Sequence, residues 1–314
     1  MSQPEPISRD NKDRFVIFPN KHQDIWDRYC ALEASQWSVR DMGMRTVLSV
    51  DLSQKETEIL KRSLAQMAIA NRLINQHLTQ VLLAEITLED ARYFLGLQNA
   101  LENVHLHSYD LLLSPLCKEN SKMDFLQKTT EAGVFRKLLS HLKEISSRPL
   151  AEKLVTYANL TELFLTSSIL PLQDSPASSK IPGLAKTFTG VMEHLKMFYE
   201  FCLHLYNYHL SRPLLPNSLK ELLLDQFDIA ALQIPSEGGE EQQEIRSLAF
   251  IKFSTDRILI SCGFDRHFDQ ENPFAAPEEN PAGSPGLAQQ RIAALRKKTG
   301  VLPSDKEPET DRDL

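Results

Sequence analysis

Residues 98–112 read QNALENVHLHSYDLL, and this stretch decides the expected fold. Glu102 precedes His105 by three positions, and Tyr109 follows His105 by four. Side chains at these spacings are neighbours on one face of an α-helix, so the three residues would form one polar column. The column continues an apolar stripe at the same steps, so we expect a buried helix face whose polar groups need partners. The stripe comprises Leu88, Ala91, Leu95, Gln98, Glu102, His105, Tyr109 and Leu112.

The Glu-x-x-His spacing of Glu102 and His105 has a known chemical use. When it projects into a helical bundle, it is the ligand unit of di-iron and di-manganese carboxylate proteins. One such pair is weak evidence by itself. The function therefore depends on whether the remaining ligands of such a site are present.

Composition and charge exclude several classes of protein. The 314 residues are 42% hydrophobic and 25% charged with a net charge of −7, which argues against a broad nucleic-acid-binding surface. The four cysteines are scattered and predict neither a zinc site nor a disulfide framework, which fits a reducing compartment. The polar N-terminus does not resemble a signal peptide, and no apolar stretch is long enough to span a membrane. We expect a cytoplasmic protein.

The pattern along the chain predicts an all-α protein. Ser53-Gln54-Lys55-Glu56 has the form of a capping box that starts a long helix, and Thr87-Leu88-Glu89-Asp90 indicates a second start. No segment reads as a strand, so we expect a mainly antiparallel helical bundle. Further helical patterns cover residues 151–170, 188–210, 217–231 and 240–262, and the proline-containing stretch 170–183 is expected to break the first of these.

The two ends of the chain differ from its middle. Residues 1–13 are expected to form a disordered arm, and residues 14–274 a single helical domain. Residues 275–314 begin with a Pro/Gly-rich linker, continue into a short basic helix and end in an acidic tail, LPSDKEPETDRDL.

Three blocks in the same order resemble a known family. RFVIFPNKHQDIWDRYCALEASQW (14–37), ARYFLGLQNALENVHLHSYDLLL (91–113) and DRILISCGFDRHFDQENPF (256–274) resemble the small, radical-generating subunit of class I ribonucleotide reductase. The resemblance implies a ferritin-like bundle, usually a homodimer, with two iron ions per chain that generate a tyrosyl radical. It also implies a large subunit as partner, docked through the C-terminal tail, and a role in deoxyribonucleotide synthesis.

The resemblance assigns the radical pathway to particular residues. Tyr109 stands at the position of the radical tyrosine, and Trp37 at that of the relay tryptophan. His194 replaces the aspartate that links this tryptophan to a metal-ligating histidine. A relay tyrosine near the C-terminus is missing, because Leu295 stands there and the last tyrosine is Tyr208.

The resemblance also assigns the metal ligands. Glu102 and His105 match the first Glu-x-x-His pair. Asn71, a polar residue on an otherwise apolar stripe, stands where the family has aspartate. Thr161 stands at the lone glutamate, and the adjacent Glu162 becomes a ligand only with a register shift of one residue.

The second Glu-x-x-His pair of the family falls on Leu195 and Phe198. Glu193 becomes a ligand only with a register shift. A di-metal centre needs about four carboxylates to balance its charge in a dry core, and Glu102 is the one certain carboxylate here. Leu195 and Phe198 are expected to pack where the metal would lie, so we expect that a high-affinity iron centre does not form.

The retained polar residues also have purely structural interpretations. Glu102 and His105 form a buried hydrogen-bonded pair left from an ancestral site, with Asn71 as a partner. Tyr109 is then a core tyrosine bonded to Glu102 or Asn71, and Trp37 is a packing residue. The remaining histidines are expected at the surface or at helix ends: His107, His194, His204 and His209.

Three functions remain open from the sequence. The preferred hypothesis is a ribonucleotide reductase small-subunit homologue without its own working di-iron and tyrosyl-radical centre. It would act as a structural or regulatory partner, pairing with itself, with an intact small subunit or with the large subunit. The alternative is an active ribonucleoside-diphosphate reductase small subunit with shifted ligands and a radical at Tyr109. A third is a ferritin-like scaffold recruited for an unrelated interaction.

Overall fold

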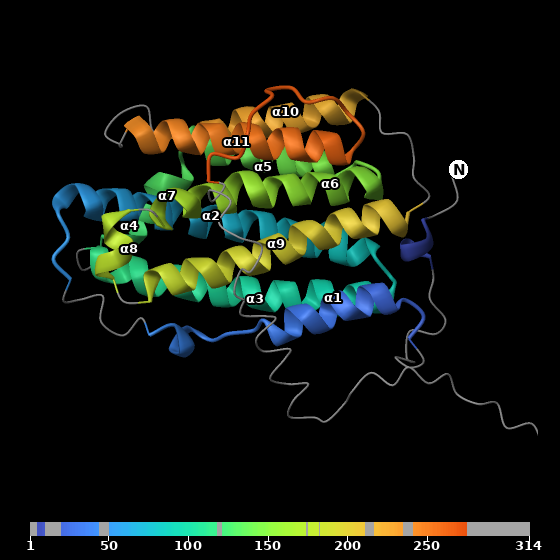
Figure 1. Ribbon diagram of the computed structural model, residues 1–314, viewed down its shortest axis with the longest axis horizontal. Helices are drawn as coiled ribbons and strands as arrows, with labels where there is room; N and C mark the ends of the chain where they lie inside the picture. The colour runs from blue at the N-terminus through green and yellow to red at the C-terminus, as the bar shows by residue number, and fades with distance from the viewer. Residues whose placement is uncertain are drawn as a thin grey trace, which may run out of the picture.

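The centre of the molecule is a bundle of four helices. The computed structural model describes residues 5–9, 20–43, 50–117, 121–173, 175–181, 183–210, 217–234 and 241–274. In these residues α2 (Gln54–Glu85) packs against α3 (Glu89–Leu113) and α6 (Leu150–Thr161), and α9 (Leu184–Tyr208) packs against α3 and α6 (Figure 1). The described residues contain no strand, which confirms the all-α prediction.

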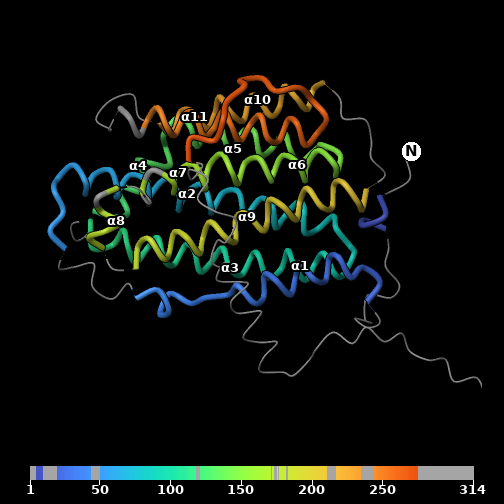
Figure 2. Tube along the Cα trace, viewed as in Figure 1, coloured from blue at the N-terminus to red at the C-terminus, as the bar shows by residue number. Residues whose placement is uncertain are grey.

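The other helices cover this centre on two sides. α1 (Gln23–Ala34) lies along α3 and also contacts α9, and α10 (Asn217–Ala231) pairs with α11 (Glu241–Ser261) on the opposite side (Figure 2). None of the described helices is long and apolar enough to cross a membrane. The shorter helices are α4 (Lys122–Thr130), α5 (Gly133–Ser146), α7 (Ser167–Gln173) and α8 (Pro176–Lys180).

The start of α2 is the predicted capping box. The Ser53 hydroxyl accepts a hydrogen bond from the Glu56 backbone N–H at 3.2 Å, and the Glu56 carboxylate accepts one from the Ser53 N–H at 2.8 Å. Two N–H groups that have no partner within the helix are satisfied in this way.

The start of α3 differs from its prediction. Thr87 does not cap the helix, which begins at Glu89 without a side-chain cap. Instead the Ile7 carbonyl accepts hydrogen bonds from the Thr87 and Leu88 N–H groups at 2.9 and 3.1 Å. Ile7 is 2% exposed. Residues 5–9 are thus held against the bundle, although the sequence places them in a disordered arm; the rest of that arm and the tail 275–314 lie outside the described residues.

A π-helical segment connects α6 to α7. It runs from Glu162 to Thr166, so the helical path that begins at Leu150 continues to Gln173, three residues beyond the predicted end. A π turn has i→i+5 hydrogen bonds and therefore changes which side chains face the core. The segment begins directly after Thr161, so this change falls at Thr161 and Glu162, the two residues considered for one metal-ligand position.

Candidate functional site

The polar column of α3 lies in the centre of the bundle. Glu102 is 6% exposed, and His105 and Tyr109 are fully buried. Glu102 faces Asn71 on α2 and lines a small cavity together with Phe198 of α9, and His105 faces His194 of α9. The helical spacing therefore brings the three residues to one buried face, as the sequence predicts.

The Glu102 carboxylate is held by three donors. Gln98 Nε2 donates to Oε1 at 2.7 Å, and Asn71 Nδ2 donates to Oε2. His105 Nδ1 lies 3.2 Å from the same Oε2. Burial opposes ionisation, but the charge of His105 and these hydrogen bonds hold the pKa of Glu102 below its usual value. Glu102 is thus an ionised group whose charge is balanced by protein donors.

A row of hydrogen bonds extends from Glu102 to the end of α1. His105 Nε2 lies 2.9 Å from His194 Nδ1, and His194 Nε2 lies 3.2 Å from the Ser35 carbonyl oxygen. The carbonyl can only accept, so His194 Nε2 carries a proton. One further proton lies between the two imidazoles, and His105 Nδ1 faces the Glu102 carboxylate. The geometry therefore describes one continuous hydrogen-bonded row from Glu102 through His105 and His194 to Ser35.

Trp37 packs flat against both histidines. Its ring centroid is 5.7 Å from that of His105 and 5.8 Å from that of His194, with interplanar angles of 23° and 12°. Gly190 on α9 makes room for the indole, because a Cβ built there would lie 2.7 Å from Trp37 Nε1. Trp37 therefore packs between α3 and α9, just beyond the end of α1.

The hydrogen bonding of Tyr109 differs from what the sequence predicts. Its hydroxyl has no hydrogen-bond partner among the described residues, so the expected bond to Glu102 or Asn71 is wrong. Burial, and then the nearby negative charge of Glu102, raise the pKa of Tyr109 well above the usual 10.0. The side chain is a neutral phenol inside the core.

Thr161 and Glu162 point to different places. Thr161 lines a small cavity beside Glu102, and its hydroxyl donates to the Tyr157 carbonyl at 3.0 Å. Glu162 begins the π-helical segment and pairs with Arg257 of α11 at 2.8 Å. Burial raises the pKa of Glu162, although the Arg257 guanidinium opposes this. The carboxylate of Glu162 is therefore paired with a guanidinium of α11.

Apolar side chains occupy the two expected ligand positions on α9. Leu195 is fully buried and Phe198 is 2% exposed, and Phe198 lines the same cavity as Thr161. Glu193 is half-buried and does not line this cavity. The cavity has a volume of about 20 Å³, which is room for about one water molecule.

The family model described as "Ribonucleotide reductase, small chain" matches residues 14–273. The chain belongs to this family. It is 29% identical over 283 residues to the ribonucleoside-diphosphate reductase small subunit of Dictyostelium discoideum, covering 86% of this chain and 82% of that one. It is 25% identical over 318 residues to the ribonucleoside-diphosphate reductase subunit M2 of Homo sapiens, covering 96% of this chain and 80% of that one.

Solved structures of small-chain proteins share the fold. The Rnr4 homodimer from Saccharomyces cerevisiae matches with a TM-score of 0.78 at 19% identity, covering 93% of each chain. The dimanganese(II)-NrdF of Streptococcus sanguinis matches with a TM-score of 0.62 at 15% identity, covering 90% of this chain and 99% of that one. The ferritin-like bundle expected of a reductase small chain is confirmed.

In this small-chain homologue His194 lies between Trp37 and His105, where the resemblance places the aspartate that links the tryptophan to a metal-ligating histidine. The other expectation, a histidine at the surface or at a helix end, is wrong, because the His194 side chain is fully buried. His107 is exposed, as expected. Leu295 and the docking tail lie outside the described residues.

Proposed function

We propose that this chain is a reductase small-subunit homologue without a working di-iron and tyrosyl-radical centre, and that it acts as a structural or regulatory partner of other reductase subunits. The observation that carries the proposal is the set of donors on Glu102. Asn71, Gln98 and His105 together satisfy the carboxylate inside the core, so its charge is compensated by the protein.

The donors around Glu102 do not fit two metal ions. Asn71 presents an N–H group to Glu102, and the Thr161 hydroxyl is bonded to its own helix. Leu195 and Phe198 offer no ligand atom. Two di- or trivalent ions would face one carboxylate and one imidazole, far from the about four carboxylates that a di-metal site uses. Buried cations without such compensation are strongly disfavoured.

The two glutamates that a register shift would recruit are also poorly placed. Glu162 is engaged with Arg257, and Glu193 does not line the cavity beside Glu102. Tyr109 keeps the radical position, but it is a buried neutral phenol whose hydroxyl meets no partner among the described residues. These contacts support a structural role for the column.

The proposed partners are other reductase subunits. The Rnr4 structure that this fold matches is a homodimer, and we propose that this chain likewise pairs with itself or with an intact small subunit. Its acidic C-terminal residues, EPETDRDL (307–314), would dock on the large subunit. A chain that lacks residues 307–314 should lose binding to a reductase large subunit. Equal binding by the shortened chain would refute tail docking.

One experiment separates this proposal from an active radical-generating subunit. The full chain is incubated with Fe(II) and oxygen, iron is counted per chain, and an EPR spectrum is recorded beside that of Tyr109→Phe. We expect no di-iron centre and no tyrosyl signal. Two irons per chain with an EPR signal that disappears in Tyr109→Phe would establish the alternative, an active ribonucleoside-diphosphate reductase small subunit.

A further inference from the structure

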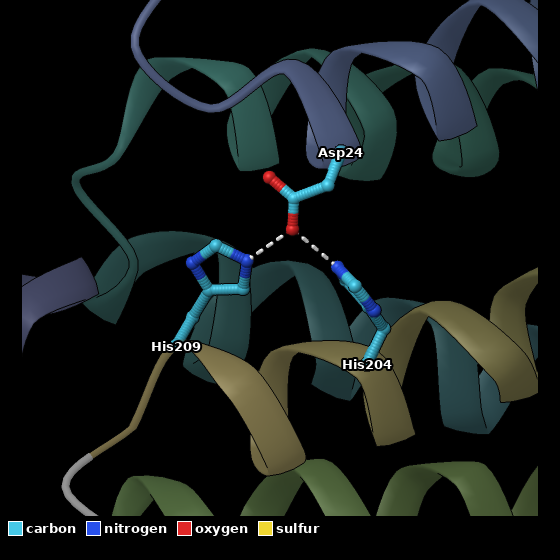
Figure 3. Close-up of side chains that lie close together, drawn as sticks. All are labelled: Asp24, His204 and His209. Carbon is cyan, nitrogen blue, oxygen red and sulfur yellow. Dashed lines mark hydrogen bonds and ion pairs between the residues drawn. The ribbon is translucent and has the colours of Figure 1, made fainter.

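Three potential metal ligands meet where α1 crosses the end of α9. The Asp24 carboxylate lies between two imidazole rings, and its Oδ2 is 2.6 Å from both His204 Nε2 and His209 Nε2 (Figure 3). The three ligand atoms lie within 4.8 Å of one another. The histidine side chains are 11% and 12% exposed and that of Asp24 is 46% exposed, so the cluster is open to solvent on one side.

The end of α9 explains how the two histidines converge. On a regular helix, residues five positions apart point about 140° away from each other. His204 lies within α9, but His209 is the residue after its last turn and has a φ of −120°. This break in the helical path lets the His209 ring return toward His204, with 5.3 Å between their centroids. Asp24, in the first turn of α1, closes the group.

We propose that Asp24, His204 and His209 bind a divalent transition-metal ion of the Zn²⁺ class and thereby join α1 to α9. Two imidazole nitrogens and one carboxylate oxygen, with a fourth position left for water, are a common zinc ligand set. The group is far from Glu102 along the chain and uses none of the residues of the central column.

Local side-chain movements would let the group accept the ion. Ligand atoms at about 2.0–2.2 Å from a tetrahedral Zn²⁺ lie about 3.3 Å from one another. The two oxygen–nitrogen distances of 2.6 Å would lengthen by less than about 1 Å, which rotation of the half-exposed Asp24 side chain can supply. The two imidazole nitrogens, which lie within 4.8 Å of each other, would take the same separation of about 3.3 Å.

The charges around the group both favour and limit binding. Burial opposes ionisation of Asp24, but hydrogen bonds from His209 and His204 lower the pKa of this carboxyl to about 2. The buried Asp90 of α3 interacts electrostatically with Asp24 and adds negative charge. Arg28 acts in the opposite direction, because its Nη2 lies 3.2 Å from His204 Nδ1. A metal on Nε2 requires a proton on Nδ1, so Arg28 must turn away when the ion binds.

The first test is titration of the full chain with Zn²⁺ by calorimetry. We expect one ion per chain, with affinity at least about 100-fold lower in His204→Ala and His209→Ala, since each removes a ligand. His107→Ala, which removes an exposed histidine of α3, should bind like the unaltered chain. Arg28→Gln should bind more tightly, because the glutamine oxygen can accept the Nδ1 proton of His204.

A second measurement guards against variants that do not fold. Asp24→Asn keeps an acceptor for the histidines but loses the charge, so it should fold normally and bind Zn²⁺ at least about 10-fold more weakly. Co²⁺ in the unaltered chain should give the visible absorption of a tetrahedral site, and Asp24→Asn should lose it. Absence of binding, or equal Zn²⁺ affinity in His204→Ala, His209→Ala and the unaltered chain, would overturn the proposal.

Discussion

Asn71 donates a hydrogen bond to Glu102 across the interface of α2 and α3. An amide thus stands against the buried carboxylate at the position where the family resemblance places an aspartate. An amide can donate to a carboxylate, whereas a second carboxylate would repel it. This contact, with those of Gln98 and His105, satisfies the buried carboxylate by protein groups, and it leads to the first two predictions.

Asn71→Asp should destabilise the protein. It places two carboxylates together in the core, so the free energy of unfolding at neutral pH should fall by about 2–4 kcal/mol. Repulsion raises the folded-state pKa of the pair, so the loss should shrink as the pH falls toward 4 and one group is protonated. Urea unfolding at several pH values measures this. Asn103→Asp, on the exposed face of α3, is the control and should change stability by less than about 0.5 kcal/mol.

Restoring the implied ligand set should restore metal binding. The variant carries Asn71→Asp, Thr161→Glu, Leu195→Glu and Phe198→His, which supplies the carboxylates and imidazole that the unaltered core lacks. With Fe(II) and oxygen it should hold about two irons per chain by elemental analysis. Adding Tyr109→Phe should leave the iron count unchanged. An iron count equal to that of the unaltered chain would mean that the positions are assigned wrongly.

Glu102→Gln should remove a pH-dependent part of the stability. The pKa of Glu102 is lowered in the folded state, so its contribution is present above the unfolded value of about 4.3 and is lost as the pH falls through the lower folded value. The glutamine would also place an amide N–H group against Asn71, Gln98 or His105, which are themselves donors. The variant should lose about 3 kcal/mol at neutral pH and much less near pH 3, measured by denaturant unfolding.

The matched control for this pH series is Glu221→Gln, an exposed position on α10. Its stability should follow that of the unaltered chain at every pH. A Glu102→Gln variant that loses the same stability at both ends of the series would show that the pKa of Glu102 is not lowered in the folded protein.

Gly190→Ala should displace Trp37. The added Cβ would lie 2.7 Å from the indole Nε1, closer than packed atoms allow, and 3.3 Å from Met42 Cε, which is a tight contact. We expect a loss of about 1–3 kcal/mol and a change in tryptophan fluorescence. Gly96→Ala on α3 meets no atom within 4 Å and should be stabilising by up to about 1 kcal/mol. Similar behaviour of the two variants would contradict the close packing of Trp37.

The sequence predicts those parts of the molecule that depend on local spacing. The column of Glu102, His105 and Tyr109 follows from helical periodicity, and the start of α2 follows from the Ser53–Glu56 capping box. These two inferences need only neighbouring residues. The amide of Asn71 was expected as a partner of the Glu102–His105 pair across 31 positions, and that expectation rests on the ligand positions that the family resemblance assigns.

The features that local sequence patterns do not predict depend on contacts between distant segments. His194 meets His105 across 89 positions and was placed there by the family resemblance alone, whereas Asp24 meets His209 across 185 positions and no pattern connects them. Threonine is a residue type that often caps helices. Here, however, the Thr87 and Leu88 N–H groups donate to the distant carbonyl of Ile7, and Thr87 does not cap the helix. The direction of Glu162 follows from a π-helical turn, which helical periodicity does not predict.

The hydrogen bond from His194 to the Ser35 carbonyl affects where this protein can be shortened. A fragment reduced to the four central helices would lose the carbonyl oxygen that accepts the proton of a fully buried imidazole, and with it the indole of Trp37 that covers both histidines. Fragments for expression or crystallisation should therefore begin before Gln23. The first helix is part of the core's hydrogen-bonding rather than an optional N-terminal extension.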